Sequence, residues 1–253
     1  MMNIASRSHR SYCSKCTTLF QCRSDFGKDW EQSIYGQLGT LEVQDMAGAH
    51  AYLVERGVAK PDQILLTGGS YGGYLTLQGL GVRPELWAGG MGVVAIAGEC
   101  GVHALTQSRS ALAVSFVALL TRKCRQPLGW HTDWAMMYED EADTLRGYQR
   151  ALFGGSPEEM PEAHAKSSPI TYVDDVAAPL LVIQGSNDTR CPPRPMEAYE
   201  ARMKAAGKQI EVQWFEAGHG SGDIALNIKQ QESMMLFALQ VLSVQAVVAT
   251  ARL

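Results

Sequence analysis

Three residues that could together perform nucleophilic catalysis each stand just past the end of a predicted strand: Ser70, Asp188 and His219. A serine hydroxyl is a weak nucleophile until a neighbouring imidazole takes its proton during attack. A carboxylate can hold that imidazole in the required tautomer and stabilise its cation. We therefore expect Ser70 to be the nucleophile, His219 the general base and Asp188 the residue that orients the base.

The segment around Ser70 reads Gly68-Gly69-Ser70-Tyr71-Gly72, which fits a G-x-S-x-G turn between a strand and a helix. Gly68 and Gly72 suit this turn because glycine accepts a close backbone approach at low cost. Two glycines around a serine also occur in ordinary loops. The apolar run before the serine and the helical pattern after it favour the catalytic interpretation.

The elements that would position these residues form an α/β pattern. In open α/β sheets, functional loops lie at the carboxyl ends of the strands. The order serine, aspartate, histidine is that of α/β-hydrolases, so we predict this fold, with a mostly parallel sheet flanked by helices. Expected inner strands are 63–67, 89–97 and 178–185, with an edge strand at 210–215; expected helices are 39–54, 74–80, from 133 onward, 196–206 and 224–242.

Bulk composition limits the class of protein. The chain has 253 residues, 46% hydrophobic and 19% charged, which suits a single α/β domain. A net charge of −4 without a basic stripe argues against nucleic acid as a partner. The apolar stretch 110–120 is too short to span a bilayer, so we expect no membrane partner. A cytoplasmic protein is the default, although the basic segment 1–24, which lacks acidic residues, resembles an organelle transit peptide.

Cysteine spacing predicts thiols rather than a disulfide framework. The six cysteines are Cys13, Cys16, Cys22, Cys100, Cys124 and Cys191. His9 with Cys13, Cys16 and Cys22 could in principle bind zinc, but the chain has a single C-x-x-C pair. We expect neither a metal nor a cofactor.

Other ionisable residues are weaker candidates for catalysis. Asp174 and Asp175 precede a predicted strand instead of following one, and His50 falls near the apolar stripe of a helix. The remaining histidines considered are His103, His131 and His164, in segments that are hard to place. The acids Glu139, Asp140, Glu141 and Asp143 suit a solvated helix face, with binding of a substrate ammonium as the alternative.

Several of these motifs resemble the catalytic domain of the prolyl oligopeptidase family of serine peptidases. They are Gly-Gly-Ser70-Tyr-Gly-Gly-Tyr, Gln-Gly-Ser-Asn-Asp188-Thr-Arg-Cys-Pro, Gly-His219-Gly and Arg-Ser-Asp-Phe-Gly-Lys-Asp-Trp30. The resemblance implies a serine hydrolase that cleaves short peptides or related amides through an acyl-enzyme. It places an α/β-hydrolase domain at 23–246, after an unplaced basic segment 1–22 and before a tail 247–253.

The chain departs from the family pattern in two ways. No segment before residue 23 matches the family's early strands. We therefore expect a gap in the sheet and the backbone N–H of Tyr71 as one oxyanion donor without a second. Residues 98–131 look inserted and have no predicted place. An esterase using the same triad and a non-catalytic, truncated remnant therefore remain alternatives, and the oligomeric state is not predicted.

Overall fold

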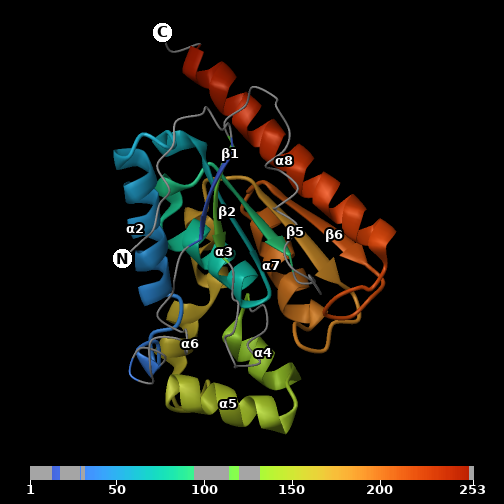
Figure 1. Ribbon diagram of the computed structural model, residues 1–253. Helices are drawn as coiled ribbons and strands as arrows, with labels where there is room; N and C mark the ends of the chain where they lie inside the picture. Colours follow the sequence, from blue (N-terminus) through green and yellow to red (C-terminus); the bar gives the residue numbers. More distant parts are fainter. Residues whose placement is uncertain (1–12, 18–28, 30–31, 94–113, 120–131, 251–253) are drawn as a thin grey trace.

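The computed structural model describes residues 13–17, 29, 32–93, 114–119 and 132–250. Within these residues, six strands form one sheet in the order β1-β4-β2-β3-β5-β6, and every neighbouring pair is parallel. The strands are β1 (Cys13–Thr17), β2 (Ile64–Gly69), β3 (Gly89–Val93), β4 (Val114–Leu119), β5 (Leu180–Gly185) and β6 (Ile210–Phe215). The parallel sheet flanked by helices confirms the predicted fold class (Figure 1).

Helices cover both faces of the sheet, as a parallel sheet requires. They are α2 (Leu41–Glu55), α3 (Tyr71–Val82), α4 (Trp134–Asp140), α5 (Asp143–Phe153), α6 (Pro161–Ser167), α7 (Pro193–Ala205) and α8 (Ile224–Thr250), with short 3-10 helices at Pro61–Gln63, Pro84–Leu86 and Pro169–Asp175. Figure 1 shows α2 and α8 on opposite sides of the sheet, with α4 and α5 beyond one end of it.

Alternate residues of the inner strands enter two separate cores. In β2, Ile64 and Leu66 belong to the hydrophobic cluster that also holds side chains of α2, α3 and α7. Leu65 belongs to a second cluster, which holds side chains of α8. The strand period of two produces this division, because successive side chains point to opposite faces. Both faces of the first part of β2 are buried, which explains why the strand begins with the apolar run Ile64-Leu65-Leu66.

The expected gap in the sheet is a wrong prediction. Strand β4 lies between β1 and β2, with Val114 beside Cys13 and Val117 beside Leu66. It comes from the segment 98–131, for which no place was predicted, and β1 comes from the segment 1–22. A sheet is assembled by backbone pairing, so a strand that comes later in the chain can occupy a place between two earlier ones. The apolar run Val114–Leu119 takes that place here.

Several element boundaries differ from expectation. The helix after Ser70 starts at Tyr71 and not at Tyr74, and α8 continues to Thr250. The stretch around Pro161 contains α6. Strand β1 lies at Cys13–Thr17, and residues 94–97 of the predicted strand 89–97 lie outside the described residues. Among the described residues, no helix is both long and apolar enough to cross a membrane.

Candidate active site

Ser70 sits at a sharp turn between β2 and α3. Its backbone angles are φ 52° and ψ −123°, and no other non-glycine residue in the described parts of the chain has a positive φ. Such a conformation costs on the order of 1–3 kcal/mol and persists when surrounding structure enforces it. The amide of Ser70 donates a hydrogen bond of 3.0 Å to the carbonyl of Val93 at the end of β3, which helps to hold the turn.

Two glycines allow the chain to fold back at this turn. A Cβ atom at position 68 would overlap the backbone carbonyl of Gly72 in the first turn of α3. A Cβ atom at position 69 would approach the Val93 carbonyl at 3.1 Å. Close backbone packing, rather than an unusual φ, therefore requires glycine at position 68.

Backbone contacts between the loops after β5 and β6 bring Asp188 and His219 together. The amide of Ser186 donates to the carbonyl of Phe215 at 2.9 Å, and the amide of Asn187 donates to the carbonyl of Ala217 at 3.1 Å. A side chain at Gly185 would overlap the carbonyl oxygen of Gly218. The two loops therefore lie backbone to backbone, with the Asp188 side chain against His219 and the His219 side chain against Ser70.

The structure brings the three sequence-predicted residues into one hydrogen-bonded chain. His219 Nε2 lies 3.0 Å from Ser70 Oγ, and His219 Nδ1 lies 2.8 Å from Asp188 Oδ2. Asp188 Oδ1 accepts hydrogen bonds from the amides of Arg190 at 2.8 Å and Cys191 at 2.9 Å. The Asp188 side chain is fully buried and that of His219 is 20% exposed. This arrangement can move a proton from the serine hydroxyl to the imidazole while the carboxylate holds the ring.

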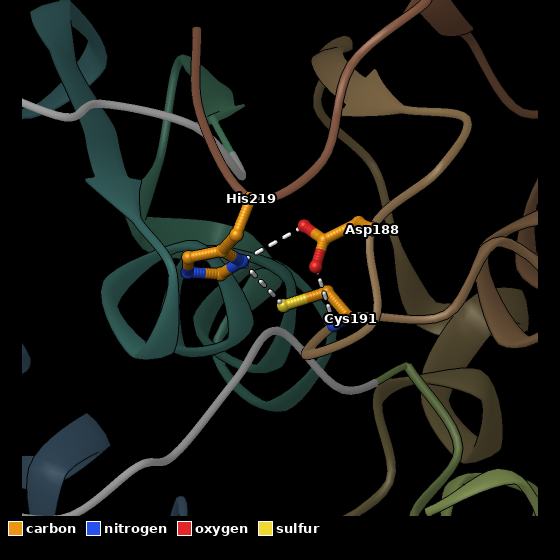
Figure 2. Close-up of side chains that lie close together, drawn as sticks. All are labelled: Asp188, Cys191 and His219. Atoms are coloured by element: carbon orange, nitrogen blue, oxygen red, sulfur yellow. Dashed lines mark hydrogen bonds and ion pairs between the residues drawn. The ribbon is translucent and has the colours of Figure 1, made fainter.

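A thiol that the sequence did not single out for this site lies beside the imidazole. Cys191 is buried, and its Sγ is 3.4 Å from His219 Nδ1 (Figure 2). Its amide also fixes Asp188. The position of Cys191 three residues after Asp188 was the available signal, but a cysteine there is equally compatible with packing.

A second residue that was missed is Glu42 of α2, which lies behind the turn at Ser70. Glu42 is fully buried, and its Oε1 accepts a hydrogen bond of 2.6 Å from the hydroxyl of Tyr71. Burial raises the pKa of Glu42 to about 7, against the effect of the Tyr71 hydrogen bond, which lowers it. The amide of Tyr71, the expected oxyanion donor, belongs to the first residue of α3 and adjoins Ser70. No second oxyanion donor is assigned among the described residues.

The rival residues have other partners. Asp174 forms an ion pair with Arg202 at the surface. His164 stacks on Phe153, and burial lowers its pKa. His50 Nε2 lies 3.2 Å from the carbonyl of Pro61. His103, His131 and the possible zinc ligand His9 lie outside the described residues, and the structure describes no side chains for Cys13, Cys16 or Cys22.

The acids after Trp134 divide into paired and buried groups. Arg194 of α7 binds Glu139 Oε2 at 2.8 Å and Asp140 Oδ1 at 2.9 Å, which ties α7 to α4. Asp143 pairs with Arg146. Glu141 does not belong to a solvated face: it is 8% exposed, and burial raises its pKa to about 7.

Solved structures define the class to which this fold belongs. The crystal structure of a puromycin hydrolase superposes with a TM-score of 0.68 at 22% identity, covering 87% of this chain and 28% of that chain. An acylaminoacyl peptidase in complex with Z-Gly-Gly-Phe-chloromethyl ketone superposes with a TM-score of 0.63 at 22% identity, covering 83% and 29%. These structural neighbours are α/β-hydrolase peptidases, so the chain has the α/β-hydrolase fold.

The sequence profile of the prolyl oligopeptidase family matches residues 21–108 and 130–245, and the chain belongs to this family. Dipeptidyl aminopeptidase BIII of Pseudoxanthomonas mexicana is 27% identical over 202 residues, covering 79% of this chain. The acylamino-acid-releasing enzyme of Arabidopsis thaliana is 26% identical over 189 residues, covering 74%. This chain spans 25% of the first protein's length and 21% of the second's. The resemblance found from the motifs is confirmed.

Proposed function

We propose that this chain is a serine peptidase domain that hydrolyses peptide or aminoacyl amide bonds through an acyl-enzyme. The observation that carries the proposal is the hydrogen-bonded chain from Ser70 Oγ to His219 Nε2, at 3.0 Å, and from His219 Nδ1 to Asp188 Oδ2, at 2.8 Å. Membership of a peptidase family and the peptide-derived inhibitor bound to one structural neighbour support an amide substrate.

The proposed reaction has two stages. His219 Nε2 takes the proton of Ser70 as its Oγ attacks the substrate carbonyl, and then gives that proton to the departing amine. Water next attacks the acyl-serine while His219 accepts a proton from it. His219 then returns that proton to Ser70 Oγ as the bond between Oγ and the acyl carbon breaks. The amide of Tyr71 donates a hydrogen bond to the oxygen that becomes negative; removal of one such donor costs roughly 10²- to 10³-fold in other hydrolases.

Labelling with a fluorophosphonate tests the nucleophile separately from the substrate. We expect one label per chain on Ser70 and none on the Ser70→Ala variant. A folded sample with a cooperative unfolding transition that takes up no label would contradict the catalytic role and favour a non-catalytic remnant.

Hydrolysis assays test the substrate class. We expect release of the amine from aminoacyl and dipeptidyl anilides, lost in the Ser70→Ala variant. Hydrolysis of a p-nitrophenyl ester without hydrolysis of any anilide would overturn the peptidase proposal and assign an esterase.

A further inference from the structure

Three side chains next to the nucleophile bring different metal-ligand atoms close together: those of Asp188, Cys191 and His219. A carboxylate oxygen, a sulfur and an imidazole nitrogen lie within 4.8 Å of one another (Figure 2). Zinc binds all three ligand types, and other thiophilic divalent ions favour the sulfur and nitrogen. Sequence spacing does not predict this group, because 28 positions separate Cys191 from His219.

The two separations that involve His219 Nδ1 can be compared with those of a tetrahedral site. Zinc–ligand bonds of about 2.0–2.3 Å place two ligand atoms about 3.3–3.6 Å apart. The distance of 3.4 Å between Cys191 Sγ and His219 Nδ1 already fits. The distance of 2.8 Å between His219 Nδ1 and Asp188 Oδ2 must open by about 0.5 Å to admit the same ion. The ion would therefore replace the hydrogen bond between Asp188 and His219.

We propose that Asp188, Cys191 and His219 form a binding site for a thiophilic divalent cation such as Zn²⁺ or Cd²⁺, and that occupation of this site switches off the hydrolase. Cation binding is independent of catalysis, whereas the inhibition rests on the proposed serine hydrolase function. Asp188 keeps its Oδ1 on the amides of Arg190 and Cys191 and offers Oδ2 to the cation. Solvent completes the coordination.

The proton balance explains the loss of activity. Metal coordination requires the Cys191 thiolate, so the thiol proton leaves to solvent. Coordination by His219 Nδ1 requires that nitrogen to carry no proton, and the neutral ring therefore holds its proton on Nε2. An Nε2–H cannot accept the proton of Ser70. One bound cation thus releases one proton and converts the base into its inactive tautomer.

A titration with Cd²⁺ tests the site without reference to activity. Cys13 and Cys16 form a separate thiol pair in the sequence, so the full chain with Cys13→Ser and Cys16→Ser is the matched background. We expect a thiolate-to-cadmium absorption band in this background, and its loss when Cys191→Ser is added. Cys191→Ser preserves the size of the side chain; Cys191→Ala serves as a second variant. Absence of the band in the background protein would overturn the proposal. So would a band in the two Cys191 variants that is as strong as the band in the background protein.

Inhibition provides the second measurement. Each protein is compared with its own rate in the presence of EDTA, so a change in basal activity does not affect the result. We expect Zn²⁺ to stop hydrolysis reversibly, and each Cys191 variant to need at least about 10-fold more Zn²⁺, because even the loss of an outer-shell partner costs that much affinity. Equal sensitivity would refute the link between the thiol and inhibition. A cadmium band in a chain without hydrolase activity would preserve the metal site and reject the proposed function.

Discussion

The two carboxylate oxygens of Asp188 have different partners. A substitution that changes only one of these oxygens can therefore test the proposed mechanism. Oδ1 is held by two backbone amides, while Oδ2 faces His219 Nδ1. An asparagine would keep its Oδ1 on the amides, since only an oxygen can accept their hydrogen bonds. Its NH₂ group would then face Nδ1 and favour the tautomer with the proton on Nε2.

We therefore predict that Asp188→Asn lowers the turnover rate by about 10⁴-fold with little change in fold, as expected for a base held in the wrong tautomer. Steady-state hydrolysis and circular dichroism check this prediction. Asp174→Asn is the matched control, because Asp174 pairs with Arg202 on the surface and should leave the rate unchanged. A similar rate loss in both variants would remove the special role of Asp188.

Gly68 gives a second prediction for a single residue. Gly68→Ala places a methyl group against the carbonyl of Gly72, and backbone cannot move aside as a flexible side chain can. We expect the free energy of unfolding to fall by about 1–3 kcal/mol or more, with loss of fluorophosphonate labelling. Chemical denaturation measures the first effect.

Gly48 of α2 is the control for that substitution, because nothing lies within 4 Å of a Cβ atom there. Gly48→Ala should stabilise the protein by up to about 1 kcal/mol through helix propensity. If both variants have the stability of the wild type, the close approach at the turn is not a constraint.

At the scale of elements, the hydrogen bond between Glu42 and Tyr71 couples α2 to the start of α3. The pKa of Glu42 is about 7 in the folded protein, above the ordinary value of 4.5. The folded protein therefore retains a proton that the unfolded chain releases between these two pH values. The free energy of unfolding must fall as pH rises from about 4.5 to 7 and then level off.

We predict that this decline amounts to at most about 3 kcal/mol for Glu42 and that Glu42→Gln removes it, while the glutamine oxygen keeps the bond to Tyr71. Urea unfolding at a series of pH values provides the measurement. Glu141→Gln is the companion variant, because burial also raises the pKa of Glu141 to about 7. Glu141 therefore contributes separately to the decline in the free energy of unfolding between about pH 4.5 and 7. An unchanged decline in Glu42→Gln would show that Glu42 is not the group responsible.

At the scale of the whole molecule, the sheet depends on β4 being an inner strand. Its pairing with β1 on one side and β2 on the other engages backbone groups in both directions. Proline cannot donate to such a ladder and is found in sheets essentially at edges or bulges. The place of this strand can therefore be tested through the backbone alone.

We expect Val117→Pro to abolish the cooperative unfolding transition or to reduce stability far more than Val117→Ala, which keeps the backbone N–H. Thermal and chemical denaturation compare the two variants. Equal stability of the proline and alanine variants would show that residues 114–119 do not lie inside the sheet.

Much of the fold and the choice of site residues could be predicted from the sequence, because they depend on the residue types within each short segment. The apolar runs before Ser70 and Asp188 indicated buried parallel strands because both faces of such strands need apolar side chains. The alternation in Ile210–Phe215 indicated an edge strand, and β6 lies at the end of the sheet among the strands that the structure describes. Helix ends were less predictable, since α3 begins as soon as the backbone leaves the turn at Ser70.

Sequence by itself determined the parallel sheet and the candidates Ser70, Asp188 and His219, because these follow from residue type and strand pattern near each position. The family was found from the resemblance of the motifs and is shown by the family match. Tertiary structure decided which strand lies beside β2, since backbone pairing does not depend on order along the chain. It also decided that Cys191 and Glu42 lie against His219 and Tyr71. Contacts between residues far apart in the chain arise from packing, and no local pattern encodes them.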